Sequence, residues 1–252
     1  MSEMLPKMFA GTSIYTETRR KIFLILAVSV SIIYPVLAVD YLAPIRVWFP
    51  LVALLGIYLI RTERPKSIPT WVIYNIFSIY FMVYATYSFG TQLQPKWMVL
   101  FLGGMLIYDL VGVKGGQMQS MAGKMINWGV PIFILVPHTE QFDFSTFKGI
   151  ISDEGLEGLH ETDQGVSMLG IGDGFLPGAL AISASTLGTI TLFGPIQLTL
   201  PQVGAALGGI TGLALLMWAE LPRAIAALIV SVPGALIGLG IGIGLDQLIV
   251  WI

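Results

Sequence analysis

Two carboxylates lie well inside apolar stretches that are long enough to cross a membrane. They are Asp109, in "LIYDLVGV", and Asp173, in "LGIGDGFLPG". A carboxylate near the bilayer centre costs about 2.5 to 3.5 kcal/mol even on the lower insertion scales, so both residues require a function or a strong structural reason. Two neighbouring carboxyls support peptide-bond hydrolysis, in which one donates a proton to the scissile carbonyl oxygen and its ionised partner takes a proton from water.

The composition indicates a polytopic membrane protein. Hydrophobic residues make up 55% of the 252 residues and charged residues only 11%. The absence of cysteine excludes disulfides, thiol nucleophiles and thiolate metal sites, and the net charge of −2 argues against a nucleic-acid surface.

Seven apolar runs predict membrane-spanning helices, at 21–39, 43–60, 71–90, 97–113, 166–187, 201–219 and 224–245. The stretch 117–137 predicts a short amphipathic surface helix, with Met118, Met121 and Met125 on one face, followed by an extended segment, "PIFILVP". The predicted fold class is therefore all-α, a polytopic transmembrane helical bundle of about seven spans plus one short amphipathic helix.

The whole chain, 1–252, is predicted to form a single membrane domain, because no linker or repeat divides it. Its predicted parts are a cytoplasmic leader at 1–20, three spans within 21–90, and a catalytic half at 97–245. That half includes an acidic cytoplasmic loop at 138–165, in which "FDFSTFKGII" is a candidate strand for pairing with an extended substrate. His138 and His160 of this loop are interpreted as surface histidines, since no third metal ligand accompanies them.

Lysine and arginine are concentrated on one side of the membrane if the seven spans alternate. This asymmetry predicts that the N-terminus and the 114–165 loop are cytoplasmic and that the C-terminus lies on the opposite side. At about 1.5 Å per residue, Asp109 and Asp173 would lie roughly 6 Å and 10 Å from the cytoplasmic ends of their helices. The two carboxyls are therefore expected to face each other at similar depth.

The motifs around the two aspartates resemble those of the presenilin and signal peptide peptidase family of intramembrane aspartyl proteases, most closely its archaeal presenilin homologues. Tyr108 precedes Asp109, and Gly170, Ile171 and Gly172 precede Asp173 on the following span. The resemblance runs from about Trp71 to the C-terminus. It implies a presenilin-like bundle in which the two aspartates are the catalytic pair, with Tyr108 and the Gly-Ile-Gly segment shaping the substrate site.

By this resemblance the substrates are single-span membrane proteins, cleaved within the lipid bilayer without a metal or other cofactor. Only three spans precede the Tyr-Asp helix, so the first two of the family's nine helices are expected to be missing. The oligomeric state stays open.

The family's Pro-Ala-Leu motif also helps to shape the site. Its counterpart here is predicted at Ala226, Ala227 and Leu228, with alanine in place of proline; the alternative is the segment 233–236, "PGAL".

Two other function classes remain open from the residues alone. A proton-coupled transporter or channel could use the two carboxylates as a relay. A catalytically weak family member could act as a membrane scaffold, because the Pro-Ala-Leu region is altered. Only a protease would release peptide fragments.

Overall fold

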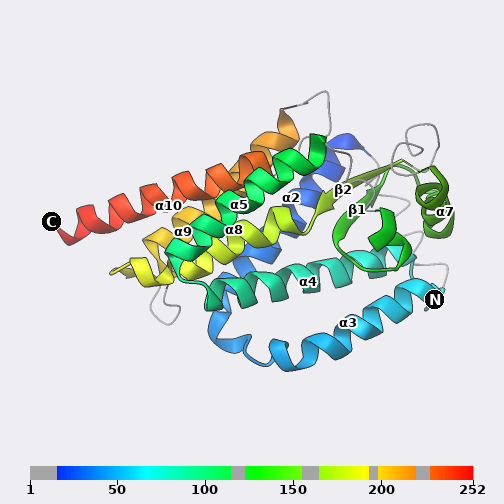
Figure 1. Ribbon diagram of the computed structural model, residues 1–252, viewed down its shortest axis with the longest axis horizontal. Coiled ribbons are helices and arrows are strands. Elements are labelled where there is room, and N and C mark those ends of the chain that lie inside the picture. The colour runs from blue at the N-terminus through cyan, green and yellow to red at the C-terminus, as the bar shows by residue number, and fades with distance from the viewer. Residues whose placement is uncertain (1–15, 115–122, 155–164, 193–197, 220–227, 252) are drawn as a thin grey trace.

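The computed structural model describes residues 16–114, 123–154, 165–192, 198–219 and 228–251. The first half of the chain is an up-and-down series of helices (Figure 1). Their bounds are α2 (Glu17–Leu37), the 3-10 turn η1 (Val39–Tyr41), α3 (Ile45–Thr62), α4 (Thr70–Gln92) and α5 (Pro95–Lys114).

The second half combines helices with two small antiparallel sheets. The strand β1 pairs with β2, and β3 pairs with β4. The elements are β1 (Phe133–Pro137), α7 (Phe144–Glu154), β2 (Val166–Gly170), α8 (Gly172–Ser183), the 3-10 turn η3 (Ala184–Leu187), β3 (Thr191–Leu192), β4 (Leu198–Thr199), α9 (Leu200–Trp218) and α10 (Leu228–Val250).

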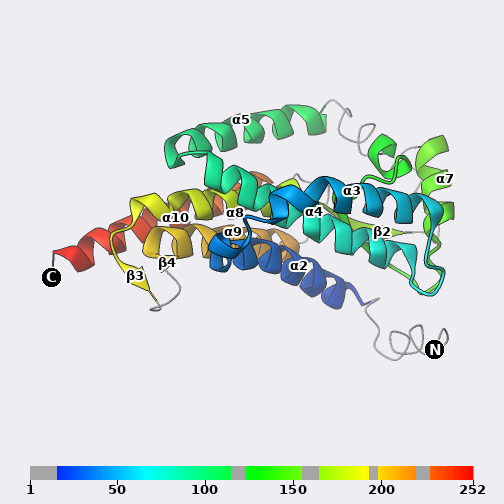
Figure 2. The same ribbon diagram turned by 90° about the horizontal axis from the view of Figure 1, so that it is seen from below.

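Five helices among the described residues, α2, α3, α4, α9 and α10, are long and apolar enough to cross a membrane. The helices α5 and α8 run alongside them (Figures 1 and 2). The predicted all-α membrane bundle is confirmed, with two short sheets added, whereas the predicted count of seven spans is not established.

The region 166–187 was wrongly predicted as one spanning helix. It forms the strand β2, the twelve-residue helix α8 and the turn η3. Mean hydropathy cannot separate a strand from a helix, and here the residues of β2 find a partner strand in β1. Residues 123–127 are helical, in agreement with the predicted surface helix, and "PIFILVP" contains the predicted extended segment as β1. Met118 and Met121 lie outside the described residues.

The helix α8 forms the centre of the bundle. It contacts α2, α4, α5, α9 and α10, and its residues 176–184 are buried. A helix that is apolar on every side is stable only when other elements surround it, which explains why so short a helix occupies the core.

Small residues allow the central helices to approach closely. A methyl group added at Gly178 of α8 would lie 2.7 Å from Cγ2 of Thr86 in α4, and one added at Gly209 of α9 would lie 2.5 Å from Cβ of Pro177. Gly204, Gly208 and Gly212 of α9 face the backbone of α10, so their small-xxx-small spacing serves packing within this chain.

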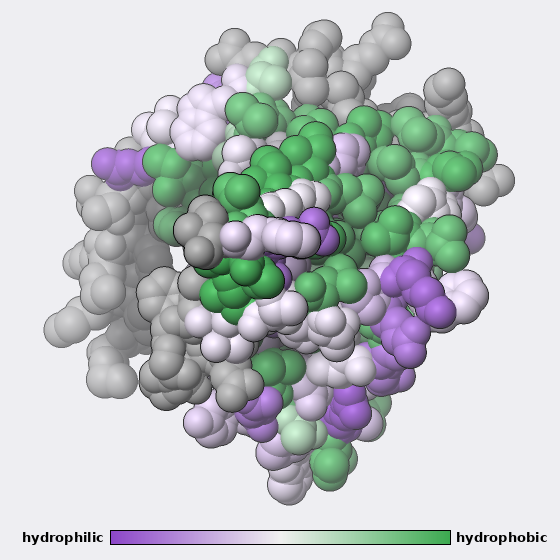
Figure 3. Space-filling view, turned by 90° about the vertical axis from the view of Figure 1, so that its left-hand side faces the viewer, coloured by the Kyte–Doolittle hydropathy of each residue, from purple (hydrophilic) through white to green (hydrophobic). Residues whose placement is uncertain are grey.

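Exposed tryptophans mark both ends of the bundle. Trp48 and Trp97 lie in the first turns of α3 and α5, Trp218 is the last residue of α9, and Trp251 directly follows α10. Tryptophan favours the boundary between lipid and water, so the bundle axis runs across the membrane. Figure 3 views the end where α10 finishes, at which hydrophilic and apolar residues are mixed.

Candidate active site

Asp109 is almost completely buried although its neighbours in α5 are not. It retains 3% of its accessible surface, whereas Tyr108 is 56% exposed and Val111 is 66% exposed. Because α5 packs against α8 and α10, Asp109 occupies the face of the helix that is turned toward the bundle. Tyr108 forms no hydrogen bond with any described residue, so the structure does not bring its hydroxyl to either aspartate.

Asp173 lies in the first turn of α8, directly after β2. Backbone N–H groups of Gly170 and Leu228 lie near its carboxylate and stabilise its negative charge. The carboxylate is turned back toward the strand, since a methyl group added at Gly170 would lie 3.4 Å from Oδ2 of Asp173. The position near a helix start corrects the expectation of Asp173 about 10 Å inside a span, and places it where the helix dipole favours a negative charge.

The two carboxyl groups act on each other electrostatically, with the charge of Asp109 reaching Asp173. They come from α5 and α8, which pack together although 64 residues separate the aspartates in the chain. Two interacting carboxyls titrate as a unit and share protons, which is the property that acid–base hydrolysis requires.

The β1–β2 sheet positions the segment that precedes Asp173. Its register pairs Phe133 with Gly170 and Leu135 with Met168. The N–H of Ile171 donates to the carbonyl of Ile132, and the N–H of His138 donates to the carbonyl of Gly165. The sheet therefore holds the chain on both sides of β2 and delivers Gly170 to the start of α8.

The outer edge of β1 is covered by side chains of α4. The Asn75 amide donates from Nδ2 to the carbonyl of Leu135 and accepts at Oδ1 from its N–H, with both distances 2.7 Å. The hydroxyl of Ser78 donates to the carbonyl of Phe133. Asn75 thus replaces a third strand, a role that its polar side chain within an apolar span could have signalled but that the sequence analysis missed.

The outer edge of β2 has no such cover among the described residues. In an antiparallel pair, residues alternate between bonding to the partner strand and turning their N–H and C=O outward. Since Ile171 and Gly165 bond to the side of β1, the intervening residues Val166 and Met168 turn their backbone groups to the open edge.

Open space adjoins the Gly-Ile-Gly-Asp segment. A methyl group at Gly172 would meet nothing within 4 Å, and one at Gly170 would meet only the Asp173 carboxylate. Further along α8, Gly174 and Gly178 are enclosed by α4 and α2. The first two glycines border free volume, while the later two serve packing.

Of the two candidate counterparts of the Pro-Ala-Leu motif, only the first includes a residue whose backbone N–H lies near Asp173, namely Leu228. Ala226 and Ala227 lie outside the described residues. In the alternative segment, Pro233 and Gly234 line the interface between α10 and α9.

The segment proposed as a substrate-pairing strand, "FDFSTFKGII", is instead largely the helix α7, so that prediction is wrong. Asp143 caps this helix by accepting hydrogen bonds from the N–H and hydroxyl of Thr146 and from the hydroxyl of Ser145. Phe144, Phe147 and Ile151 recur at helical spacing and are buried together, which stabilises the helix over a strand.

The described residues contain no group of three or more His, Asp or Glu side chains that could hold a metal ion. The ring of His138 lies 3.0 Å from the hydroxyl of Ser167 and links the end of β1 to β2. His160 lies outside the described residues.

A membrane bundle with two interacting carboxyls on packed helices has the architecture of an intramembrane aspartic protease. In agreement with this class, the family model described as signal-peptide peptidase, presenilin aspartyl protease matches residues 7–247. The chain therefore belongs to that family and is an intramembrane aspartic endopeptidase. The match begins well before Trp71, so it also includes the two helices α2 and α3. No curated protein and no solved structure matches the chain.

Proposed function

We propose that Asp109 and Asp173 are the catalytic pair and hydrolyse peptide bonds within the membrane-spanning helices of other proteins. The observation that carries this proposal is that α5 packs on α8 and each helix carries one carboxyl, with Asp109 buried on the face of α5 turned toward the bundle and Asp173 in the first turn of α8. Family membership supplies the aspartic protease chemistry. It also makes a transporter or a scaffold less well supported than a protease.

In the proposed reaction the ionised carboxylate removes a proton from a water molecule, whose oxygen attacks the scissile carbonyl carbon. The protonated carboxyl donates its proton to the carbonyl oxygen, which gives a tetrahedral diol. Collapse of the diol breaks the C–N bond, and a proton passes to the leaving nitrogen. The N–H groups of Gly170 and Leu228 near Asp173 would stabilise its carboxylate when it is ionised.

The substrate is proposed to bind as an extended strand along the open edge of β2. The N–H and C=O groups of Val166 and Met168 are turned to that edge, while β1 and Asn75 close the other side of the sheet. A peptide bond within a helix is shielded by its own hydrogen bonds, so local unwinding and strand pairing would expose the scissile carbonyl. The open space at Gly172 leaves room for that strand beside Asp173.

The proposed orientation places the N-terminus and the 114–165 loop in the cytoplasm. The start of α2, the β1–β2 sheet and α7 lie toward one end of the bundle, and the end of α10 lies at the other (Figure 1). The lysine and arginine distribution assigns the first end to the cytoplasm. Single-span substrates would enter laterally from the lipid.

The test is cleavage of a single-span model substrate by the purified protein in detergent, with fragments identified by mass spectrometry. Asp109→Ala and Asp173→Ala should each abolish the fragments while remaining folded. Asp40→Asn, which changes an exposed carboxylate in η1, is the matched control and should cleave normally. Fragments from either alanine variant would refute the assignment of the pair.

Pairing with β2 is tested separately by Met168→Pro, which removes the outward N–H, against Met168→Ala, which keeps it. Cleavage should fall strongly in the proline variant only, because proline cannot donate a hydrogen bond but is tolerated at a strand edge. Equal activity of the two variants would contradict strand pairing at this position.

A further inference from the structure

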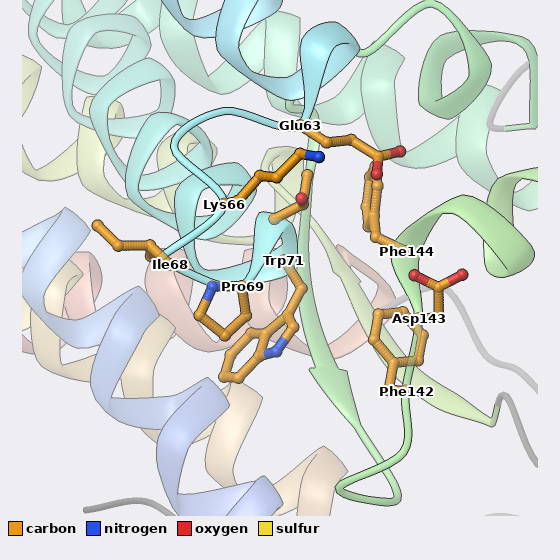
Figure 4. Close-up of a pocket in the computed structure, with 9 residues that line it drawn as sticks. Glu63, Lys66, Ile68, Pro69, Trp71, Phe142, Asp143 and Phe144 are labelled. Carbon is orange, nitrogen blue, oxygen red and sulfur yellow. The ribbon is translucent and has the colours of Figure 1, made fainter. Parts of the chain in front are cut away.

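A cavity of about 270 Å³ lies at the end of the bundle that carries α7, away from the two aspartates. It is formed where the loop between α3 and α4 meets the start of α7. Its lining combines two carboxylates, one ammonium and several aromatic rings, and Figure 4 shows these side chains around the hollow. The lining side chains used below are Glu63, Lys66, Trp71, Phe142, Asp143 and Phe144.

The two carboxylates come from different segments of the chain. Glu63 is the C-cap of α3 in a left-handed conformation (φ 50°), and its backbone N–H donates to the carbonyl of Leu59. Asp143 is fixed by its hydrogen bonds with Ser145 and Thr146 at the start of α7. The Asp143 carboxylate therefore lies in a defined position, whereas the Glu63 side chain can turn toward a ligand.

The aromatic wall is rigid. Phe144 is 3% exposed, and its ring centroid lies 5.5 Å from that of Tyr74 and 5.9 Å from that of Phe147. Phe142 packs 5.3 Å from Phe147. Aromatic faces beside carboxylates favour an organic ammonium group, which gains both cation–π attraction and charge-assisted hydrogen bonds.

Lys66 supplies the opposite charge at the same cavity. It is exposed, and neither it nor Glu63 forms a hydrogen bond or an ion pair with another described residue. An ammonium in this position binds a phosphate as a point charge. The cavity thus offers one site for an anion and two carboxylates for a cation, a pattern that matches a zwitterion.

The position of the cavity relative to the membrane indicates the source of such a ligand. The loop 63–69 joins two candidate membrane spans, α3 and α4, so the cavity lies at the level of lipid headgroups. Its lining comes from the α3–α4 loop, the first residues of α4 and the segment at the start of α7, and includes no residue of β2, where the substrate is proposed to bind.

We propose that this cavity binds the headgroup of a zwitterionic aminophospholipid, with the phosphate at Lys66 and the ammonium between Glu63 and Asp143, beside the Phe142 ring. The volume accommodates a phosphoethanolamine group but not the acyl chains, which would extend along α3 and α4 into the bilayer. An anionic headgroup without an ammonium, such as phosphoglycerol, would face the two carboxylates without compensation.

The experiment is native mass spectrometry of the protein released from vesicles with equal amounts of phosphatidylethanolamine and phosphatidylglycerol. The wild type should retain the ethanolamine lipid over the glycerol lipid by roughly three- to tenfold, the effect of about one charge-assisted contact. Lys66→Gln and Glu63→Gln should each remove most of that preference. Lys96→Gln is the control, because Lys96 lies beside Trp97 at the opposite end of the bundle.

Thermal unfolding of each variant in detergent verifies that it is folded. Equal retention of the two lipids by the wild type, or an unchanged preference in both cavity variants, would overturn the proposal. Two competition experiments test the source of the ligand. If soluble phosphoethanolamine displaced the bound lipid at a concentration comparable to that of the lipid, the ligand would not need to come from the membrane, and that part of the proposal would be overturned. If a lysine-rich peptide displaced the lipid, the cavity would be assigned to a protein partner instead.

Discussion

The side-chain amide of Asn75 is bonded to both backbone groups of Leu135. It donates from Nδ2 to the carbonyl and accepts at Oδ1 from the N–H, each at 2.7 Å. A buried amide in α4 thereby completes one edge of the sheet that leads to Asp173. The arrangement leaves β2 as the edge at which another strand can be added.

Replacing Asn75 with leucine should destabilise the protein by about 2 to 4 kcal/mol, because the N–H and C=O of Leu135 would be left buried without partners. Cleavage should fall as well, since the sheet would no longer hold β2. Thermal unfolding in detergent and the substrate assay measure the two effects. Ser78→Ala, which removes one hydrogen bond to the same strand, should have a smaller effect on both. A leucine variant as stable and active as the wild type would contradict this role.

Gly172→Ala and Gly174→Ala should affect different properties although the residues are two apart. A methyl group at Gly172 enters open space, so stability should be nearly unchanged while the substrate strand loses room and cleavage declines. At Gly174 the same methyl group meets Met82 and lies 3.2 Å from Cγ1 of Val28, which should cost about 1 to 3 kcal/mol. Unfolding and cleavage measured on both variants test this contrast. The opposite assignment of the two effects would show that Gly172 serves packing.

Asp143 should make stability depend on acid pH. Hydrogen bonds from Thr146 and Ser145 lower the pKa of this carboxyl from 3.8 to about 2 in the folded protein. Its contribution is therefore fully present above about pH 4 and is lost as the pH falls toward 2. Because the side chain is exposed, we expect about 1 kcal/mol, the usual size of a helix N-cap.

Asp143→Ser keeps a capping oxygen but removes the titrating group. Unfolding of this variant between pH 5 and pH 2 should show a shallower loss of stability than the wild type, with similar stability at neutral pH. Parallel pH profiles of the two proteins would contradict the assignment to Asp143.

Asp246 has a structural role that the sequence analysis did not assign to it. Although it lies near the end of α10, it is only 3% exposed. Its carboxylate accepts hydrogen bonds from the N–H and hydroxyl of Thr189 and from the N–H of Ile190. It therefore joins α10 to the segment that follows η3.

Asp246→Ala should lower the unfolding temperature, because the N–H and hydroxyl of Thr189 and the N–H of Ile190 lose their acceptor. The folded fraction should still cleave substrate, since this carboxylate is not part of the proposed catalytic pair. Unfolding and specific activity per folded protein measure this separation, with Asp40→Asn as the control. Loss of activity without loss of stability would instead connect Asp246 to catalysis.

Much of the architecture could be predicted because a helix that crosses a lipid bilayer must be apolar, and this requirement is visible in the amino-acid composition of each segment. Apolar runs located the helices within a few residues, as for 201–219 against α9 (Leu200–Trp218). The two aspartates stood out because an unpaired carboxylate in a span is costly. The segment 166–187 was predicted wrongly because mean hydropathy indicates burial, and a buried strand and a buried helix have the same hydropathy. The strand forms because it pairs with β1, whose residues lie about thirty or more positions earlier in the chain.

The sequence by itself determined a helical membrane bundle and the family to which the chain belongs, since both depend on local composition and short motifs. The tertiary structure decided which groups meet: the amide of Asn75 with Leu135, the N–H of Leu228 with Asp173, and the cavity between the α3–α4 loop and α7. These contacts join segments far apart in the chain, and no local pattern encodes them. They form only when the whole bundle packs around α8.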